Sequence, residues 1–210
     1  VLVKAGKGMI DPCPLWDDDG NAYLIRGKVC ANELYLHKMS PDGMKILDNG
    51  KLIYKDLLKQ PIIEGPKFLK KDGYYYIFAP AGSVPEGWQT ALRSKNIYGP
   101  YEDKIILHQG NTTVNGPHQG GLVELESGEW WFMHFQSKKP FGRIVHLQPV
   151  TWNAGWPIFG VDSDKDGIGE PVSVYKKPNV GKKFPVEIPQ TTDEFNENNL
   201  IEQYKNFELS

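Results

Sequence analysis

A unit of about 50 residues occurs three times along this chain and limits its fold more than any other feature. Each copy begins with a polar residue, continues through a short strand to a turn with glycine, and returns in an apolar strand. The turn glycines are Gly20, Gly73 and Gly128, so successive turns lie 53 and 55 residues apart. Strands and hairpin turns at a fixed period are typical of β-propeller blades, each built from four strands.

Two further strands are predicted in every copy. The third strand alternates apolar and polar residues, as a half-buried strand does, and the fourth is a short apolar run. We expect third strands at residues 33–37, 89–93 and 143–147, and fourth strands at residues 44–47, 105–107 and 156–159. The chain is therefore predicted to be all-β, with three consecutive propeller blades at about residues 11–62, 63–114 and 115–172.

Polar residues lead the three copies at nearly equivalent positions. Asp11 and Glu64 each lie nine residues before the turn glycine of their copy, whereas His118 lies ten residues before its glycine, one out of step. In a propeller the innermost strand of each blade lines the central axis, so equivalent positions converge. Asp11 and Glu64 are therefore expected to face each other across an axial cavity. Kelch-type interaction propellers share the period but give no reason for an acidic pair there.

The composition excludes several other classes of protein. The 210 residues are 40% hydrophobic, enough for one domain core, and the net charge of −2 is dispersed. No basic stripe indicates a nucleic-acid partner, and the apolar runs are far shorter than a membrane span. Cys13 and Cys30 are expected to be unpaired thiols. Three blades are too few to close a ring, so we expect a fragment that lacks its first blades.

Two other segments leave alternatives open. Residues 162–167 resemble the start of an EF-hand loop, but Ser173 stands where that loop requires a glutamate, which favours an acidic surface turn over a weak cation site. Trp88 follows a loop of small residues and is expected either to stack on a sugar ring or to pack between blades. Phe135 is one of four aromatic residues in the third copy. Some of them are expected to pack between blades and others to line the cavity wall, and the four are Trp130, Trp131, Phe132 and Phe135.

Four motifs in consistent order over roughly residues 8–172 resemble glycoside hydrolase family 43, in its β-xylosidase and α-L-arabinofuranosidase branch. They are residues 10–20, 63–67, 115–121 and 142–150. The resemblance implies a five-bladed β-propeller, of which about three blades are present, often followed by a β-sandwich. On this basis residues 1–175 form a partial catalytic propeller, 176–192 a linker, and 193–210 the truncated start of the sandwich.

The resemblance also implies roles for single residues. Glu64 matches the general acid that protonates the leaving sugar oxygen, and Asp11 matches the carboxylate that tunes the acid's pKa and orients the substrate. Arg143 matches an arginine that contacts sugar hydroxyls, and Trp88 and Phe135 are further substrate-binding candidates.

A histidine and an absent aspartate complete the implied site. His118 matches an axial histidine near a structural ion, usually calcium and often held through water, and no cofactor is required beyond such an ion. One histidine cannot hold calcium alone, because calcium prefers oxygen ligands. The family's catalytic base is an aspartate on the first blade, and no residue of this chain matches it.

Inversion explains why these residue types are needed. It requires two carboxyl groups about 6.5–9.5 Å apart, one protonated as the acid and one activating a water. A nearby carboxylate raises the pKa of the acid by repulsion, and burial adds to this effect. We therefore expect Asp11 to keep Glu64 protonated while the base comes from elsewhere. Simpler interpretations are a strand-end cap for Asp11, a solvent-facing Glu64 and a surface Arg143.

The predicted activity is the release of terminal xylose or arabinofuranose from hemicellulose, such as arabinoxylan and xylo-oligosaccharides, with inversion. The fragment alone is expected to be inactive. An endo-arabinanase of the same family is the alternative enzyme, and a sugar-binding propeller without catalysis is the alternative class. The expected partner is an oligosaccharide or polysaccharide, with neither nucleic acid nor membrane involved.

Overall fold

The computed structural model describes residues 8–29 and 32–183. The chain divides into two units, residues 1–179 and 180–210, and the first contains all the strands given below. The described part of the chain contains no helix with the length and apolar character needed to cross a membrane. The predicted start of a sandwich at 193–210 lies outside the described residues, as does most of the predicted linker at 176–192.

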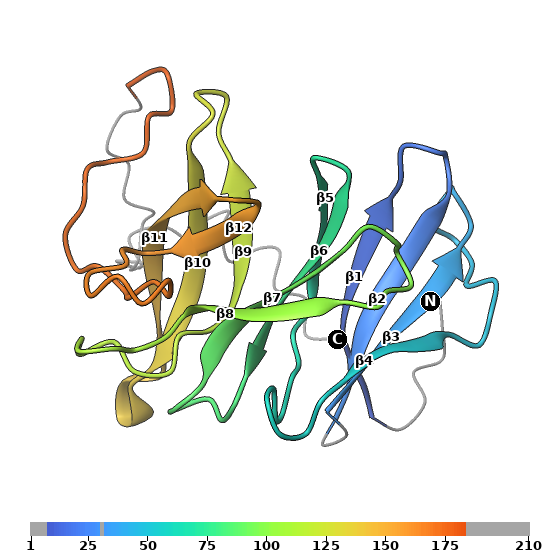
Figure 1. The fold of residues 1–210 in the computed structure, drawn as a ribbon, viewed down its shortest axis with the longest axis horizontal. Coiled ribbons are helices and arrows are strands. Elements are labelled where there is room, and N and C mark those ends of the chain that lie inside the picture. Colours follow the sequence, from blue (N-terminus) through green and yellow to red (C-terminus); the bar gives the residue numbers. More distant parts are fainter. Residues whose placement is uncertain (1–7, 30–31, 184–210) are drawn as a thin grey trace, which may run out of the picture. The chain divides into compact units, whose positions relative to one another are not determined.

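The described residues form three four-stranded antiparallel sheets that follow one another along the chain (Figure 1). Sheet A contains β1 (Met9–Trp16), β2 (Ala22–Lys28), β3 (Glu33–Met39) and β4 (Lys51–Lys55). Sheet B contains β5 (Lys67–Lys71), β6 (Tyr74–Ala81), β7 (Trp88–Ser94) and β8 (Glu102–Leu107). Sheet C contains β9 (His118–Glu124), β10 (Trp130–Ser137), β11 (Arg143–Asn153) and β12 (Trp156–Phe159), with a 3-10 turn at Lys139–Phe141.

Strands that are consecutive in sequence are neighbours in each sheet, so every sheet is a simple meander. The first strand of each sheet is an edge strand. Among these edges, β1 contacts β5, and β9 contacts β6 and β7. The first strand of sheet A thus meets the first strand of sheet B, whereas the first strand of sheet C meets the two middle strands of sheet B. The predicted all-β fold with three blade-like sheets is confirmed.

The sheets pack face to face because side chains alternate along their strands. On β6, Ile77 and Ala79 enter a core shared with sheet A, whereas Tyr76 and Phe78 enter a core shared with sheet C. The central sheet thus has two buried faces. Burial of one large apolar side chain contributes about 2 kcal/mol, so both interfaces stabilise the unit.

The hairpin turns explain the repeated glycines. Gly20, Gly73 and Gly128 all adopt positive φ, at 81°, 75° and 79°. This left-handed conformation suits glycine, because a Cβ atom makes it costly for other residues. The three turns are therefore equivalent positions of one repeated structure.

The fourth strand of sheet A is where the predicted strand positions were wrong. Residues 44–47 do not form it; the strand is β4 at Lys51–Lys55. Of the predicted run only Ile46 makes an isolated bridge, to Met39, and Met44 and Leu47 are 69% and 59% exposed. The chain makes another turn after Asp48, with Gly50 at φ 79°, before it pairs with β3. The other two fourth strands, β8 and β12, include the predicted residues.

Candidate active site

The starts of the inner strands have unusual backbone conformations. Asp11 lies at a bulge in β1 with φ 52°, Ile62 precedes Glu64 with φ 57°, and Gln119 on β9 has φ 30°. Positive φ is uncommon for residues other than glycine and often marks functional positions. Two hydrogen bonds to the end of β6 hold the segment before β5, from Glu64 N–H to the Pro80 carbonyl and from Gly82 N–H to the Pro61 carbonyl.

The Asp11 carboxylate joins all three sheets. Its Oδ2 atom accepts a hydrogen bond from the Gly65 backbone N–H at 3.2 Å and one from the Gln119 side-chain amide at 3.3 Å. The predicted proximity of Asp11 to the Glu64 segment is therefore present. The two donors therefore hold the Asp11 carboxylate in a fixed place beside the Glu64 segment.

Glu64 is the carboxyl group suited to hold a proton. Its side chain is 27% exposed and therefore largely withdrawn from water. Burial raises the pKa of Glu64, the negative charge of Asp11 raises it further, and the positive charge of Arg143 lowers it. Burial and a neighbouring carboxylate are the two physical causes that were predicted for a general acid.

His118 lies beside Glu64 but does not form an ion pair with it at neutral pH. Its Nε2 atom is 3.6 Å from Glu64 Oε1, too far for a hydrogen bond. Burial lowers the pKa of His118 to about 4, helped by the positive charge of Arg143 and opposed by Asp11. The ring is therefore neutral at neutral pH.

The surroundings of His118 leave both of its buried ring nitrogens without a hydrogen-bond partner among the described residues. The side chain is 1% exposed. Water bound to a cation could satisfy such nitrogens. Among the described residues, no cluster of three or more His, Cys, Asp or Glu ligand atoms includes His118.

Arg143 and Phe135 meet on the other side of His118. The guanidinium carbon of Arg143 lies 4.4 Å from the centroid of the Phe135 ring, and that ring lies 5.6 Å from the His118 ring. A cation over an aromatic face is held in a defined orientation. Phe135 and Gln119 also line an open depression of about 350 Å³. The structure thus brings five residues into one chain of contacts, and these are Asp11, Glu64, His118, Phe135 and Arg143.

Trp88 is the predicted site residue that the described contacts do not connect to this group. Its indole N–H donates a hydrogen bond of 2.8 Å to Gln60 Oε1, which also accepts from the Thr90 hydroxyl. The half-buried ring packs against the core between sheets A and B. These contacts fit the interpretation of Trp88 as a core residue.

Gln119, which donates to Asp11, is a further residue of the site that the sequence interpretation missed. It lies nine residues before Gly128, the same offset at which Asp11 and Glu64 precede their turn glycines. That offset was the signal that could have identified it. The sequence interpretation placed His118, one residue earlier, at the start of the third copy, and the family resemblance matches it to an axial histidine.

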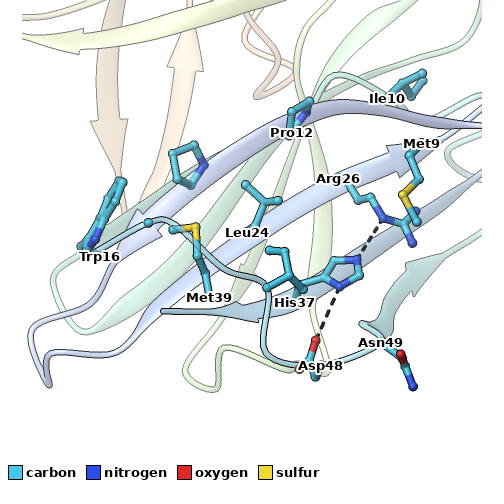
Figure 2. A pocket seen from close by; sticks show the side chains of 13 residues that line it. Met9, Ile10, Pro12, Trp16, Leu24, Arg26, His37, Met39, Asp48 and Asn49 are labelled. Carbon is cyan, nitrogen blue, oxygen red and sulfur yellow. Dashed lines mark hydrogen bonds and ion pairs between the residues drawn. The ribbon is translucent and has the colours of Figure 1, made fainter. Parts of the chain in front are cut away.

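A groove lies on the opposite face of β1 (Figure 2). It has a volume of about 740 Å³, and Ile10, Pro12 and Trp16 line it, whereas Asp11 does not. In Figure 2 the side chains of Arg26, His37 and Asp48 form a connected row in it; Arg26 Nε donates to His37 at 3.0 Å. The alternation of strand side chains separates this groove from the Glu64 group.

The acidic turn at residues 162–167 forms a separate cluster. Ligand oxygens of Asp162, Asp164 and Asp166 lie within 4.8 Å of one another. The Gly167 N–H donates to Asp162, and the Ile168 N–H donates to Asp166. Such local bonds are usual in turns rich in aspartate and fit the predicted surface turn.

Comparison with known proteins gives one consistent result. The sequence profile of the glycosyl hydrolases family 43 matches residues 1–157. A relative from Xylanibacter ruminicola, provisionally named a beta-xylosidase, is 55% identical over 177 residues, covering 84% of this chain and 33% of the relative. The beta-xylosidase of Formosa agariphila is 41% identical over 235 residues, covering 98% of this chain and 39% of the relative.

A solved structure shows the same likeness. Xylan beta-1,4-xylosidase from Bacillus halodurans C-125 matches with a TM-score of 0.77 at 28% identity, covering 93% of this chain and 40% of that protein. The chain thus spans between 33% and 40% of the length of these three proteins.

Proposed function

Because this chain belongs to family 43 of the glycosyl hydrolases, we propose that it supplies three blades and the general acid of a glycosidase. The enzyme releases terminal xylose, or alternatively arabinofuranose, from hemicellulose with inversion. The observation that carries this proposal is the position of Glu64, largely withdrawn from water beside the hydrogen-bonded Asp11, where burial and the charge of Asp11 raise its pKa. We place xylose first because the two relatives described above bear the name of beta-xylosidases.

The proposed mechanism uses Glu64 as the acid. The Glu64 carboxyl donates its proton to the oxygen of the leaving sugar as the glycosidic bond breaks. Asp11 keeps that proton on Glu64 through its negative charge. A water activated by a second carboxylate attacks the opposite face of the sugar, and this base comes from outside the chain.

The remaining residues bind and orient. Arg143, held over Phe135, donates hydrogen bonds to sugar hydroxyls, for which its planar guanidinium is suited. His118 would contact a hydrated calcium ion through water, and such an ion would add positive charge near the site. Both outer sheet faces carry exposed apolar residues, including Trp16 on sheet A and Val145 on sheet C. Further blades of a five-bladed ring, with a β-sandwich after it, cover such faces in the full-length protein.

The test replaces Glu64 by glutamine in the full-length enzyme. General acid catalysis contributes roughly 10²–10⁴-fold, so turnover of xylobiose should fall by about that factor. A nitrophenyl xyloside, whose leaving group needs little protonation, should lose much less. Glu126→Gln, in an exposed turn of sheet C, is the matched control and should keep wild-type rates.

Two results would contradict the proposal. Near-wild-type hydrolysis of xylobiose by Glu64→Gln would remove Glu64 from the acid role. Absence of turnover in the wild-type enzyme, combined with measurable sugar binding, would establish the non-catalytic alternative. The ratio of rates on nitrophenyl xyloside and nitrophenyl arabinofuranoside decides the preferred sugar.

A further inference from the structure

The Oδ2 atom of Asp11 connects the starts of the three inner strands. It accepts from Gly65 before β5 and from Gln119 on β9, so the carboxylate of sheet A is held by donors from sheets B and C. Gln119 occupies the repeat position of Asp11 and Glu64 in the third copy. The three copies therefore place an acceptor, an acid and a donor at equivalent positions.

The local geometry is arranged around the Gln119 side chain. Its backbone has φ 30°, a conformation that costs free energy in a residue with a side chain. The side chain crosses directly over Gly65: a Cβ atom at residue 65 would lie 2.7 Å from Gln119 Cγ and 3.0 Å from its amide nitrogen. Only glycine at residue 65 leaves this path to Asp11 open.

We propose that Gln119 is a positioning residue for the reaction, holding the Asp11 carboxylate in the orientation from which it acts on Glu64. This inference rests on the proposed function. The side-chain amide donates one hydrogen bond to Asp11, and a donor to a carboxylate is worth more than a neutral pair. Gln119 touches neither the departing oxygen nor the proton; its effect passes through Asp11.

A double-mutant cycle in the full-length enzyme tests the connection. Gln119→Met keeps the length of the side chain and removes the donor, and turnover of xylobiose should fall about tenfold or more with little change in KM. In an Asp11→Ala background the same substitution should change turnover less than about twofold, because the group that it positions is gone. Gln109→Met, at an exposed glutamine of the β8–β9 loop, is the matched control and should have no effect.

A second pair of variants guards against misfolding. In Gln119→Asn, the asparagine adopts the left-handed conformation easily, but its side chain is one methylene too short to reach Asp11. This variant should therefore lose turnover as Gln119→Met does. Gln119→Glu keeps the length but faces Asp11 with a like charge, so it should be slower than Gln119→Met. A packing role alone predicts no such order.

The outcomes separate this inference from the proposed function. If Glu64→Gln abolishes xylobiose turnover but Gln119→Met has the same fold effect with and without Asp11, Gln119 is only a structural link between sheets and the positioning role is wrong. If Glu64→Gln keeps wild-type turnover, the proposed acid itself is wrong. The positioning role is supported if Gln119→Met slows the wild-type enzyme but has little effect in the Asp11→Ala background. It is supported further if Gln119→Glu is slower than Gln119→Met.

Discussion

Gly65→Ala is the substitution whose cost the structure defines most directly. Gly65 has φ 54°, and an L-residue in this left-handed region pays about 1 kcal/mol. The added Cβ would lie 2.7 Å from Gln119 Cγ and 3.0 Å from Cδ, contacts that force the side chain or backbone to move. Overpacking of this kind costs about 1–3 kcal/mol. The free energy of unfolding should therefore fall by about 2–4 kcal/mol in total.

Gly73→Ala is the matched control. It has the same free-energy cost of a positive φ but no steric clash of the added Cβ atom. Gly73 has φ 75°, and a Cβ there would have no atom within 4 Å. Its cost should be about 1 kcal/mol. The difference between the two variants, about 1–3 kcal/mol, is then the steric term alone. Urea unfolding of the full-length protein, followed by tryptophan fluorescence, measures both.

The same clash has a catalytic consequence. A displaced Gln119 no longer donates to Asp11, so Gly65→Ala should lower turnover of xylobiose about tenfold or more, while Gly73→Ala stays near wild type. Equal stability and equal turnover in the two variants would refute the reasoning, because Gln119 would then have room to move without effect. If Gly65→Ala loses stability but keeps wild-type turnover, the steric clash with Gln119 is real but does not affect the reaction.

Three further predictions concern single side chains. Trp88→Phe removes the hydrogen bond to Gln60 and should lower the free energy of unfolding by about 1 kcal/mol with KM unchanged; a raised KM would return Trp88 to the substrate site. Burial lowers the pKa of His134 to about 4, below its ordinary 6.5, so the unfolded chain binds a proton first and stability should be lost as the pH falls from 6.5 to 4. His134→Gln should flatten that part of a pH series of urea titrations, and an unchanged slope would be the contrary result. Burial and Asp11 raise the pKa of Glu64, so its stabilising contribution is present below the unfolded pKa and lost as the pH rises through the folded one; Glu64→Gln should remove this decline, and its persistence would contradict the assignment.

Much of the fold follows from patterns that one sequence contains. The turn glycines at a fixed period predicted three sheets, and the alternation in β3, β7 and β11 predicted their third strands. The error at residues 44–47 has a local cause. Apolar character alone suggested a strand, but a second turn through Asp48 and Gly50 delays pairing until Lys51.

The repeat offset predicted one part of the site, and the family resemblance added His118 and Arg143 to it. The position nine residues before each turn glycine is occupied by Asp11, Glu64 and Gln119. The offset therefore identifies the two acids directly, and it identifies Gln119 when residue type is not considered. The packing of Arg143 on Phe135 could not be derived in this way, because it depends on the register between β10 and β11. The hydrogen bond of Trp88 could not be derived either, because its acceptor, Gln60, lies outside the strands.

The unusual backbone at the inner strand starts explains why this group needs all three sheets. Asp11 and Gln119 each adopt positive φ, which neither strand favours alone, and the hydrogen bond between them offsets part of that cost. Glu64 owes its raised pKa to burial and to Asp11, which depends on the donors from Gly65 and Gln119. The raised pKa of Glu64 therefore depends on the packing of the three sheets rather than on any one blade. A blade excised with its own Glu64 should lose that burial and the Asp11 charge, and with them the means to act as an acid near neutral pH.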